Sequence, residues 1–480
     1  MTPMRAAMLA AALAALAGCN LAPDYRRPLA DAPAQWKSEA PWRVSEPSDQ
    51  SLKGPWWQIF GESRLNELEL AALQQSATLE SAHAHLEQAR ATARVARATL
   101  LPQVGLMSGA ERARTSANRP LASYSVPNSS TVQNDFSAGL TVNYELDLFG
   151  ANRNAAQSAA ALAEQAAADL ENARLVLTAE VATDYFQLRE LDSEIDVVTQ
   201  SIEGQRRALE FVSARHDLGD ASGLDLAQQQ ALLDATRTQV DLLRVRRDQF
   251  EHALAVLVGR PAPDFTLAAE VAPFKVPAIP AALPSDVLER RPDVASAERA
   301  MAAANAQIGV ARAAFFPSVP LAANYGRESN MISNLTSASS LLWSFGVSAT
   351  ENLFNGGRDL ATLDYAKAGY TLVTANYRQT VLVAMQEVED GLSGLASLDR
   401  AAHEADASVV SAQRVLELAD VRYRGGVATY LDVVTAQETL LADQRQAAQI
   451  EGQQLVTAVF LVKALGGGWR DAPAPELARK

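Results

Sequence analysis

Cysteine and histidine are the residues of this 480-residue sequence that could bind a metal or act as nucleophiles, and both are scarce. Cys19 is the single cysteine, so the chain can form neither an internal disulfide nor a thiolate metal cluster. Of the five histidines, His83 and His85 lie two positions apart and would point to different sides of a helix. The sequence contains no nucleophile elbow, phosphate-binding loop or histidine–carboxylate pair at a useful spacing. It therefore predicts a protein that is not an enzyme and has no metal site or cofactor.

The chemistry that the sequence does support is acylation of Cys19. Arg5 and the apolar run 6–17 are typical of a secretory signal, and the run is shorter than the roughly 20 residues of a membrane-spanning helix. Its end, Leu16-Ala17-Gly18-Cys19, resembles the bacterial lipobox, in which the signal is cut before a cysteine that becomes diacylated. Asn20 replaces the usual aspartate of inner-membrane retention, so the resemblance implies outer-membrane delivery. A chance cysteine after an ordinary signal is the alternative.

The charge balance bears on the class of partner. The chain has 42 Lys+Arg against 56 Asp+Glu, a net charge of −14, which argues against a phosphate-binding surface and predicts no nucleic-acid partner. Hydrophobic residues make up 48%, which excludes wholesale disorder.

Two pairs of segments alternate apolar and polar residues with period two, which indicates strands with one apolar face. In residues 136–148 every even position is apolar, and the expected partner is 103–114, joined through the polar stretch 115–134. Residues 319–326 and 343–353 alternate in the same way around a polar loop, with Glu351 as an exception on the apolar face. The sequence thus predicts two β-hairpins, residues 103–148 and 317–354.

Long proline-free segments with apolar residues at every third or fourth position indicate helices. Residues 151–218 could run about 100 Å as one helix, and a break at Gly219–Gly223 separates them from a second helix, 224–258. The order recurs in 358–424, a break at Gly425-Gly426, and 429–465. Shorter helices, 63–100 and 292–314, precede the two hairpins.

The two halves of the chain are copies of one unit. Arg215-x3-Gly219-x4-Leu224-Asp225 matches Arg422-x3-Gly426-x4-Leu431-Asp432 at a spacing of 207 residues (422 − 215). A repeat of this size is a tandem duplication rather than a short-period solenoid. The predicted organisation is a signal peptide (1–18), a lipidated strap (19–62), a first repeat (63–260), a proline-rich connector (261–291), a second repeat (292–466) and a tail (467–480).

Four strands per chain limit how this protein could enter a membrane. Beyond the signal no stretch reaches the length and apolarity of a membrane helix, and an open sheet leaves strand edges unsatisfied in lipid. The smallest membrane barrels have eight strands, and an eight-stranded barrel is filled by its own side chains. Two chains would supply eight strands and three would supply twelve, so a conduit favours three. A periplasmic coiled-coil scaffold or adhesin anchored by lipid is the alternative.

Several motifs resemble the outer membrane efflux lipoproteins of the TolC superfamily, and their order extends over essentially all of the mature chain. They are Asp24-Tyr25-Arg26-Arg27-Pro28, Trp56-Trp57-Gln58-Ile59-Phe60-Gly61, Arg290-Arg291-Pro292-Asp293-Val294, Ala297-Glu298-Arg299, the stretch 308–317, Leu353-Phe354-Asn355-Gly356-Gly357-Arg358 and Tyr423-Arg424-Gly425-Gly426. The resemblance implies an α+β, TolC-like fold: a homotrimeric twelve-stranded β-barrel continuous with a long periplasmic α-helical barrel.

The same resemblance implies the function. Such proteins are the outer membrane channels of tripartite pumps, and they export drugs or other toxic compounds together with a periplasmic adaptor and an inner-membrane transporter. The acylated cysteine points to the resistance-nodulation-division branch, with a type I protein-secretion channel as the alternative.

The resemblance also implies an iris gate at the helix breaks. Asp432 takes the position of an acidic ring that would favour cations, Tyr423 matches a gate tyrosine, and Asp225 matches a carboxylate that the tyrosine can bind. We therefore predict a Tyr423–Asp225 hydrogen bond that holds the closed state. Thr435 stands where TolC has a second acid, and Ala428 stands where TolC has a gate arginine, so a double acidic ring and that arginine's tether are not expected.

Simpler roles remain open for these positions. Asp225 and Asp432 each begin a predicted helix, where a carboxylate caps the backbone or complements the helix dipole, and this does not exclude a gate role. The glycines of the two breaks are expected to supply positive φ angles; they are Gly219, Gly223, Gly425 and Gly426.

Overall fold

The computed structural model describes residues 20–25, 54–118, 130–271, 275–277, 279, 287 and 290–467. The chain divides into two compact units. The first comprises Met1–Pro28, Leu86–Gln165 and Ala297–Tyr377, and the second comprises Leu29–His85, Ala166–Ser296 and Arg378–Lys480. Each unit therefore draws segments from both copies of the repeat.

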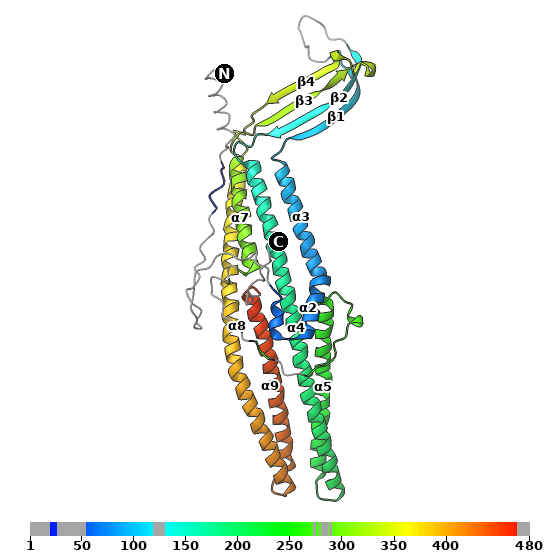
Figure 1. The fold of residues 1–480 in the computed structure, drawn as a ribbon, viewed down its shortest axis with the longest axis vertical. Coiled ribbons are helices and arrows are strands. Elements are labelled where there is room, and N and C mark those ends of the chain that lie inside the picture. Colours follow the sequence, from blue (N-terminus) through cyan, green and yellow to red (C-terminus); the bar gives the residue numbers. More distant parts are fainter. Residues whose placement is uncertain are drawn as a thin grey trace, which may run out of the picture. The chain divides into compact units, whose positions relative to one another are not determined.

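The first unit contains one antiparallel sheet of four strands in the order β1-β2-β3-β4 (Figure 1). The strands are β1 (Gln103–Thr115), β2 (Thr131–Glu145), β3 (Pro320–Ser329) and β4 (Leu341–Val347), with short 3₁₀ turns at Ile332–Asn334 and Ala338–Ser340 between the last two. Since β2 pairs with β3, the hairpins of the two copies join into a single sheet.

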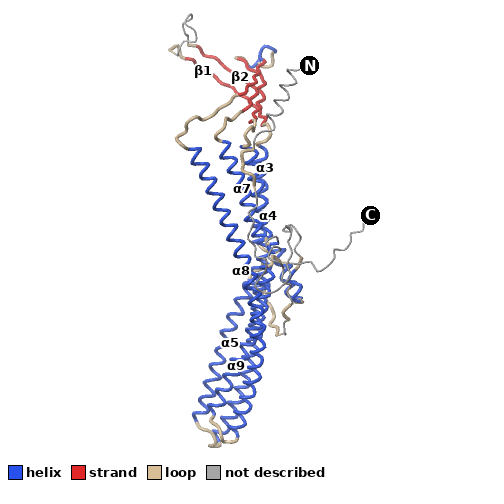
Figure 2. The backbone as a smooth tube through the Cα atoms, turned by 90° about the vertical axis from the view of Figure 1, so that its left-hand side faces the viewer, coloured by secondary structure: helices blue, strands red, loops and turns tan. Residues whose placement is uncertain are grey.

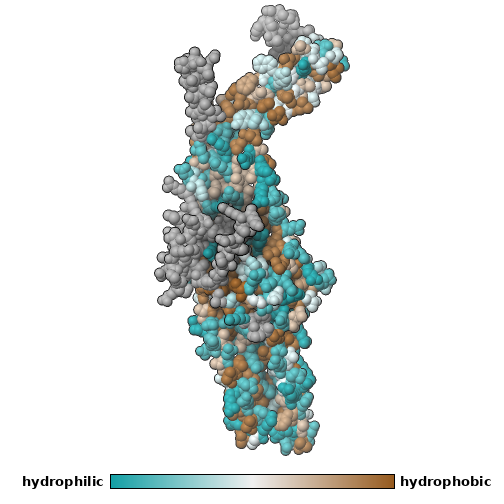
Figure 3. Space-filling view, in the orientation of Figure 1, coloured by the Kyte–Doolittle hydropathy of each residue, from teal (hydrophilic) through white to brown (hydrophobic). Residues whose placement is uncertain are grey.

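The strand register aligns apolar residues in rows on one face of this sheet. One row is Leu106, Leu140, Tyr325 and Trp343, and the next is Val104, Val142, Ala323 and Phe345. The intervening positions form a row of small and polar residues on the other face: Gly105, Thr141, Asn324 and Ser344. The predicted division of each strand into an apolar and a polar face is confirmed, and hydrophobic residues are visible over the sheet in Figure 3.

Both C-terminal strand ends come earlier than the alternation predicted. β2 ends at Glu145 rather than 148, because Asp147 turns to accept hydrogen bonds from the backbone N–H groups of Asn152 and Arg153 at the start of the next helix. β4 ends at Val347 rather than 353. Its partner β3 begins at Pro320, which has no N–H, and beyond it the strands share only an isolated bridge.

Residues 20–25, the start of the strap, follow helix α7 (Pro292–Ala313). The carbonyl oxygen of Leu21 accepts a hydrogen bond from Arg312, that of Pro23 accepts one from Asn305, and the Tyr25 hydroxyl donates to Glu298. Residues 20–25 therefore run antiparallel to the helix, with their first residue near its C-terminal end.

Four long helices continue through the chain as two matching pairs (Figure 2). α4 (Ala151–Asp217) and α8 (Arg358–Arg424) have 67 residues each, and α5 (Gly223–Leu257) and α9 (Tyr430–Ala464) have 35 each. The predicted helices and the breaks between them are confirmed. Among the described residues, no helix combines the length and the apolar composition that crossing a membrane would require.

The helix predicted over 63–100 is broken in two, α2 (Ser63–Gln75) and α3 (Ala77–Ala98). Ser76 between them is extended. At this break the backbone of Gly259 lies so close to α2 that a Cβ on it would stand 2.4 Å from the carbonyl oxygen of Gln75. The break thus coincides with the packing of the end of α5 against the end of α2.

The core of the second unit gathers around the short helix Trp56–Phe60 and the middle of α4, including Trp56, Trp57, Tyr185 and Phe186. Glu69 of α2 is also fully buried, and neither of its carboxyl oxygens has a hydrogen-bond partner in the described part of the chain. Burial raises the pKa of Glu69 to about 9, so this carboxyl group is protonated at neutral pH.

Candidate gate at the helix tips

The turn between α4 and α5 is a helix stop followed by a helix start. Gly219 adopts a φ of 79°, and the N–H of Asp220 donates to the carbonyl of Arg215, which satisfies the last turn of α4. Ser222 then caps α5, because its hydroxyl accepts a hydrogen bond from the N–H of Asp225 while the Asp225 carboxylate accepts from Ser222.

The turn between α8 and α9 repeats this construction 207 residues later. Gly426 adopts a φ of 72°, Val427 donates to the carbonyl of Arg422, and Thr429 with Asp432 forms the second capping box. The expected positive φ is present at Gly219 and Gly426. It was wrong for Gly223, which is already the first residue of α5, and for Gly425, which precedes the left-handed residue.

The predicted hydrogen bond between Tyr423 and Asp225 is present, with the hydroxyl oxygen 3.3 Å from Oδ2. Tyr423 is 8% exposed, and its ring packs against Tyr430 and beneath the guanidinium of Arg215, at 4.9 and 5.2 Å respectively. Burial, followed by the nearby Asp225 carboxylate, raises the pKa of Tyr423, so the phenol keeps its proton and acts as the donor.

Asp432 and Thr435 both lie on the exposed side of α9. The backbone N–H and the hydroxyl of Thr429 both donate to the same oxygen of Asp432, Oδ2, at 2.9 Å. The capping role proposed as the simpler alternative is therefore real for Asp225 and Asp432 alike. Both of these cap hydrogen bonds go to Oδ2, so Oδ1 of Asp432 takes no part in the cap.

A second link between the two helix pairs was missed at the sequence level. The hydroxyl of Tyr430 donates to Oε1 of Gln229 at 2.7 Å, and the amide nitrogen of Gln229 donates to the carbonyl of Gln205 at 2.9 Å. Both side chains are buried, and Tyr430 lies in a cluster with Val212, Val433 and Val434. No motif marks Gln229, and the repeat gives no signal either, because its equivalent in the second copy is Ala436.

A cavity of about 620 Å³ lies beside these links, between α4 on one side and α8 and α9 on the other. Aromatic, cationic and acidic side chains line it together, among them Phe211, Tyr423, Tyr430, Arg424 and Asp420. Beside this cavity, the two helix pairs are joined at the tips by a seam, which consists of a small buried apolar cluster and the two tyrosine hydrogen bonds. The capping bonds of each turn lie within one helix pair and are separate from this seam.

A family model described as outer membrane efflux protein matches residues 70–260 and 283–467. The chain belongs to the outer membrane efflux protein family. Relatives of this efflux protein include the pyoverdine export outer membrane protein OpmQ of Pseudomonas aeruginosa, 34% identical over 452 residues and 94% of each chain. The toluene efflux pump outer membrane protein TtgF of Pseudomonas putida is 32% identical over 464 residues and 95% of each chain.

Solved structures agree with this assignment. The outer-membrane channel OprN superimposes with a TM-score of 0.85 at 30% identity, covering 94% of this chain and 100% of that chain. The open state of the Neisseria gonorrhoeae MtrE outer membrane channel gives 0.80 at 28%, covering 94% and 98%. The efflux protein therefore has the predicted α+β, TolC-like channel fold, and its family is one of channels rather than enzymes. Cys19, the predicted lipidation site, lies outside the described residues.

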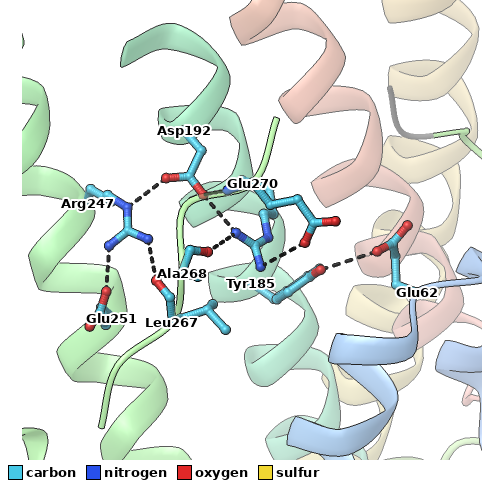
Figure 4. Close-up of polar contacts among 9 residues, drawn as sticks. Glu62, Tyr185, Asp192, Arg247, Glu251, Leu267, Ala268 and Glu270 are labelled. Atoms are coloured by element: carbon cyan, nitrogen blue, oxygen red, sulfur yellow. Dashed lines mark hydrogen bonds and ion pairs between the residues drawn. The ribbon is translucent and has the colours of Figure 1, made fainter. Parts of the chain in front are cut away.

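A buried ion network farther along the second unit was also missed (Figure 4). Asp192 of α4 accepts from Arg189 at 2.8 Å and from Arg247 of α5 at 2.6 Å. The same two arginines donate to the carbonyl oxygens of Ala268 and Leu267, at 2.8 and 2.6 Å. These bonds fasten the start of the connector to both helices of the first copy, which makes the network an anchor for the efflux protein's scaffold.

Proposed function

We propose that three copies of the chain pool their sheets into one twelve-stranded barrel that conducts small molecules across the outer membrane. The observation that carries this proposal is the alignment of apolar rows on one face of a sheet whose outer strands, β1 and β4, pair on one side only within the described residues. Lipid offers no hydrogen bonds to such edges, so β1 of one subunit would pair with β4 of the next. The polar face would then line the water-filled lumen.

The partners follow from the same assignment. The chain would receive its cargo from a periplasmic adaptor and an inner-membrane transporter of the resistance-nodulation-division class, and an acylated Cys19 would tether its N-terminus to the outer membrane. One relative is named for pyoverdine export and another for toluene efflux. Because these cargoes share little chemistry, we place cargo choice in the inner-membrane partner and propose a passive conduit here.

The helix tips would form the periplasmic gate. Tyr423–Asp225 and Tyr430–Gln229 join the two helix pairs of one chain, and each bond contributes about 0.5–1.5 kcal/mol, more where the acceptor is charged. The gate would be held closed by several weak latches. Three Asp432 carboxylates around the axis would favour cations at the constriction, with Thr435 one turn farther along α9.

Two substitutions at neighbouring positions of β4 test the barrel. Phe345 belongs to the apolar face and Ser344 to the polar face. Phe345→Arg places a charge toward lipid, which costs about 2–4 kcal/mol near the bilayer midplane, whereas Ser344→Arg places it in the lumen. We expect Phe345→Arg to prevent recovery of trimers from outer membranes. Ser344→Arg should yield normal trimers with altered ion selectivity in planar bilayers.

The readouts are the mass of the detergent-solubilised particle and its single-channel conductance. If both variants assemble equally well, the assignment of faces is wrong. A wild-type particle containing one chain, or a wild-type trimer that conducts no ions, would remove the channel proposal itself.

A further inference from the structure

The seam within one chain is asymmetric between the two copies. The second copy supplies the donors, Tyr423 and Tyr430, and the first copy supplies the acceptors, Asp225 and Gln229. Each helix pair therefore contacts the other through one of its two sides. The opposite side of each pair makes no such contact within the described residues of a single chain.

The repeat identifies what stands on those opposite sides. Subtracting 207 from Tyr423 gives His216, and adding 207 to Asp225 gives Asp432. The local packing matches as well. Tyr423 lies against Tyr430, seven residues later, while His216 lies with Nε2 3.8 Å from the position of a Cβ on Gly223, also seven residues later. His216 thus takes the place of the donor on the opposite side of the first helix pair, and Asp432 takes the place of the acceptor on the opposite side of the second.

We infer that His216 of one subunit donates a hydrogen bond to the partner subunit's Asp432, as the counterpart of the Tyr423–Asp225 bond within a chain. The inference rests on the proposed trimer, in which first and second copies alternate around a ring. The His216 side chain is 42% exposed, and Asp432 is exposed with its cap hydrogen bonds on Oδ2 alone. Both groups are therefore accessible to a second copy of this chain.

The other latches lack such counterparts. Tyr430 corresponds to Gly223, and Gln229 corresponds to Ala436, so the seam between subunits would lose the buried amide bond. Arg445 of α9, which binds Glu194 of α4 and Gln239 of α5 within one chain, corresponds to Thr238. The His216–Asp432 contact would thus be the main polar latch between subunits.

A histidine donor makes this latch a candidate for control by pH, since histidine is the side chain whose charge can change near physiological pH. The charged groups around His216 are Arg215, Asp217 and Asp220 on its own helix and turn, with Oδ1 of Asp217 3.7 Å from Nδ1. Asp225 follows on α5. The partner subunit's Asp432 and the partner subunit's Arg422, which corresponds to Arg215, would face the imidazole from the other side.

These charges decide whether the contact between subunits strengthens or weakens as pH falls. Asp217 and the partner subunit's Asp432 favour the imidazolium, while the partner subunit's Arg422 opposes it. Arg215, which corresponds to Arg422, stacks on the Tyr423 ring rather than bonding to the Asp225 carboxylate. We therefore expect the partner subunit's Asp432 to outweigh the partner subunit's Arg422, so that the seam between subunits tightens as pH falls. The Tyr423–Asp225 seam contains no imidazole.

The first experiment is chemical cross-linking of the full mature trimer. A cysteine pair at His216 and Asp432 should be joined between chains by a short bismaleimide, giving dimers and trimers in a denaturing gel. The matched pair at Tyr423 and Asp225 should join within one chain and leave the monomer mass unchanged. A 216/432 pair that links only within chains, or does not link in an intact trimer, overturns the inference and leaves the channel proposal standing.

The second experiment is conductance in planar bilayers at about pH 5.5 and 7.5, on either side of the imidazole titration. We expect the wild-type open probability to be about two- to fivefold lower at the acid pH, as for a half-exposed ion pair. His216→Phe should abolish that difference, and His216→Tyr should keep the low open probability at both values. His252→Phe, an exposed histidine of α5 outside the tips, should behave as wild type. A pH difference that survives His216→Phe contradicts the inference.

Discussion

The two copies of the repeat agree at the helix tips and differ where their connecting segments are anchored. Each copy ends its long helix at a left-handed glycine and starts the next with a capping box, at Gly219 and Ser222 or at Gly426 and Thr429. The ion network of the first copy has no such counterpart, since the positions equivalent to Arg189 and Arg247 are Ala396 and Gln454. The two copies therefore share the backbone geometry of their turns. Their anchoring arginines differ, because each copy anchors a different connecting segment.

The second copy is anchored by a different arginine. Arg291, 6% exposed, pairs with Asp293 and Glu387 and donates to the carbonyl oxygen of Ala464 near the end of α9. At the same place Gly466, with a φ of 85°, lies against the backbone of Arg290, as Gly259 lies against Gln75 in the first copy. In the first copy the end of α5 packs against the end of α2, and in the second copy the end of α9 packs against the start of α7. The two joints use different polar contacts.

The copies also differ in buried acids. The pKa values of three carboxyl groups of the first copy are raised: Glu69, Asp184 and Glu190. Burial is the main cause in each case. The positions equivalent to Asp184 and Glu190 in the second copy are Gly391 and Ser397. Asp184 and Glu190 therefore make a pH-dependent contribution to stability that Gly391 and Ser397 cannot make.

The largest effect is expected from Asp192→Ala. The side chain of Asp192 is 1% exposed and neutralises two arginines that are themselves 2% and 13% exposed. Its removal takes away the buried counter-charge that the two arginines share and leaves Arg247 with Glu251 and Arg189 with the exposed Glu270. Breaking a buried pair costs about 3–5 kcal/mol, and we expect a loss near the lower end of that range. Asp399→Ala, the equivalent and exposed position of the second copy, should change stability by less than about 0.5 kcal/mol. Thermal unfolding followed by circular dichroism measures both, and similar losses would contradict the contrast between the copies.

Sequence patterns predicted the parts of this fold that repeat with a short period. The helices, their breaks and the apolar face of each strand follow from local spacing, and Tyr423 and Asp225 were paired through a resemblance. The network around Asp192 could not be predicted in this way. It joins Arg189, Arg247 and the carbonyls of residues 267–268, which lie in three separate segments, and no local pattern requires them to meet.

The strand ends and the break at Ser76 were missed for a related reason. Alternation continues through residue 353, but a strand also needs a partner, and β3 begins only at Pro320. Nothing in the periodicity of residues 63–100 signals the approach of Gly259 from α5. Local propensity sets the type of these elements, whereas distant segments determine where β4 and α2 end.

An intermediate, pH-dependent effect is expected from Glu190→Gln. Burial, followed by repulsion from Glu194, raises the pKa of Glu190 from 4.5 to about 7. The folded state then holds the proton more tightly than the unfolded chain, so the contribution of Glu190 is most favourable below pH 4.5. It falls as pH rises to about 7, by at most about 1.4 kcal/mol per pH unit, and then levels off.

The measurement is the free energy of unfolding of wild type and variant at several pH values. Glu190→Gln should gain stability relative to wild type as pH rises from about 5 to 8, because its amide never ionises. Glu210→Gln, an exposed position of the same helix, should stay parallel to wild type. A constant gap between Glu190→Gln and wild type would show that the carboxyl does not titrate in this range.

The smallest effect is expected from Tyr423→Phe, which removes one hydroxyl from the seam within a chain. Asp225 keeps its bonds to Ser222, so no buried acceptor is left without a donor and the loss is about 0.5–1.5 kcal/mol. Single-channel conductance should rise. Combining the change with Asp225→Ala should add little to that rise, because both remove the same bond, while the second change also removes the cap contacts with Ser222 and lowers stability. Tyr365→Phe, at an exposed tyrosine of α8, is the control.

This variant also separates the two kinds of seam. If the latches within and between subunits act independently, Tyr423→Phe should raise conductance by the same factor at acid and neutral pH and leave the wild-type pH dependence intact. Loss of the pH dependence would mean that the seam between subunits closes only when the seam within each chain is already closed. Unchanged conductance at both pH values would show that Tyr423 does not contribute to the gate. A bond that stabilises the closed state must shift the open population when it is removed.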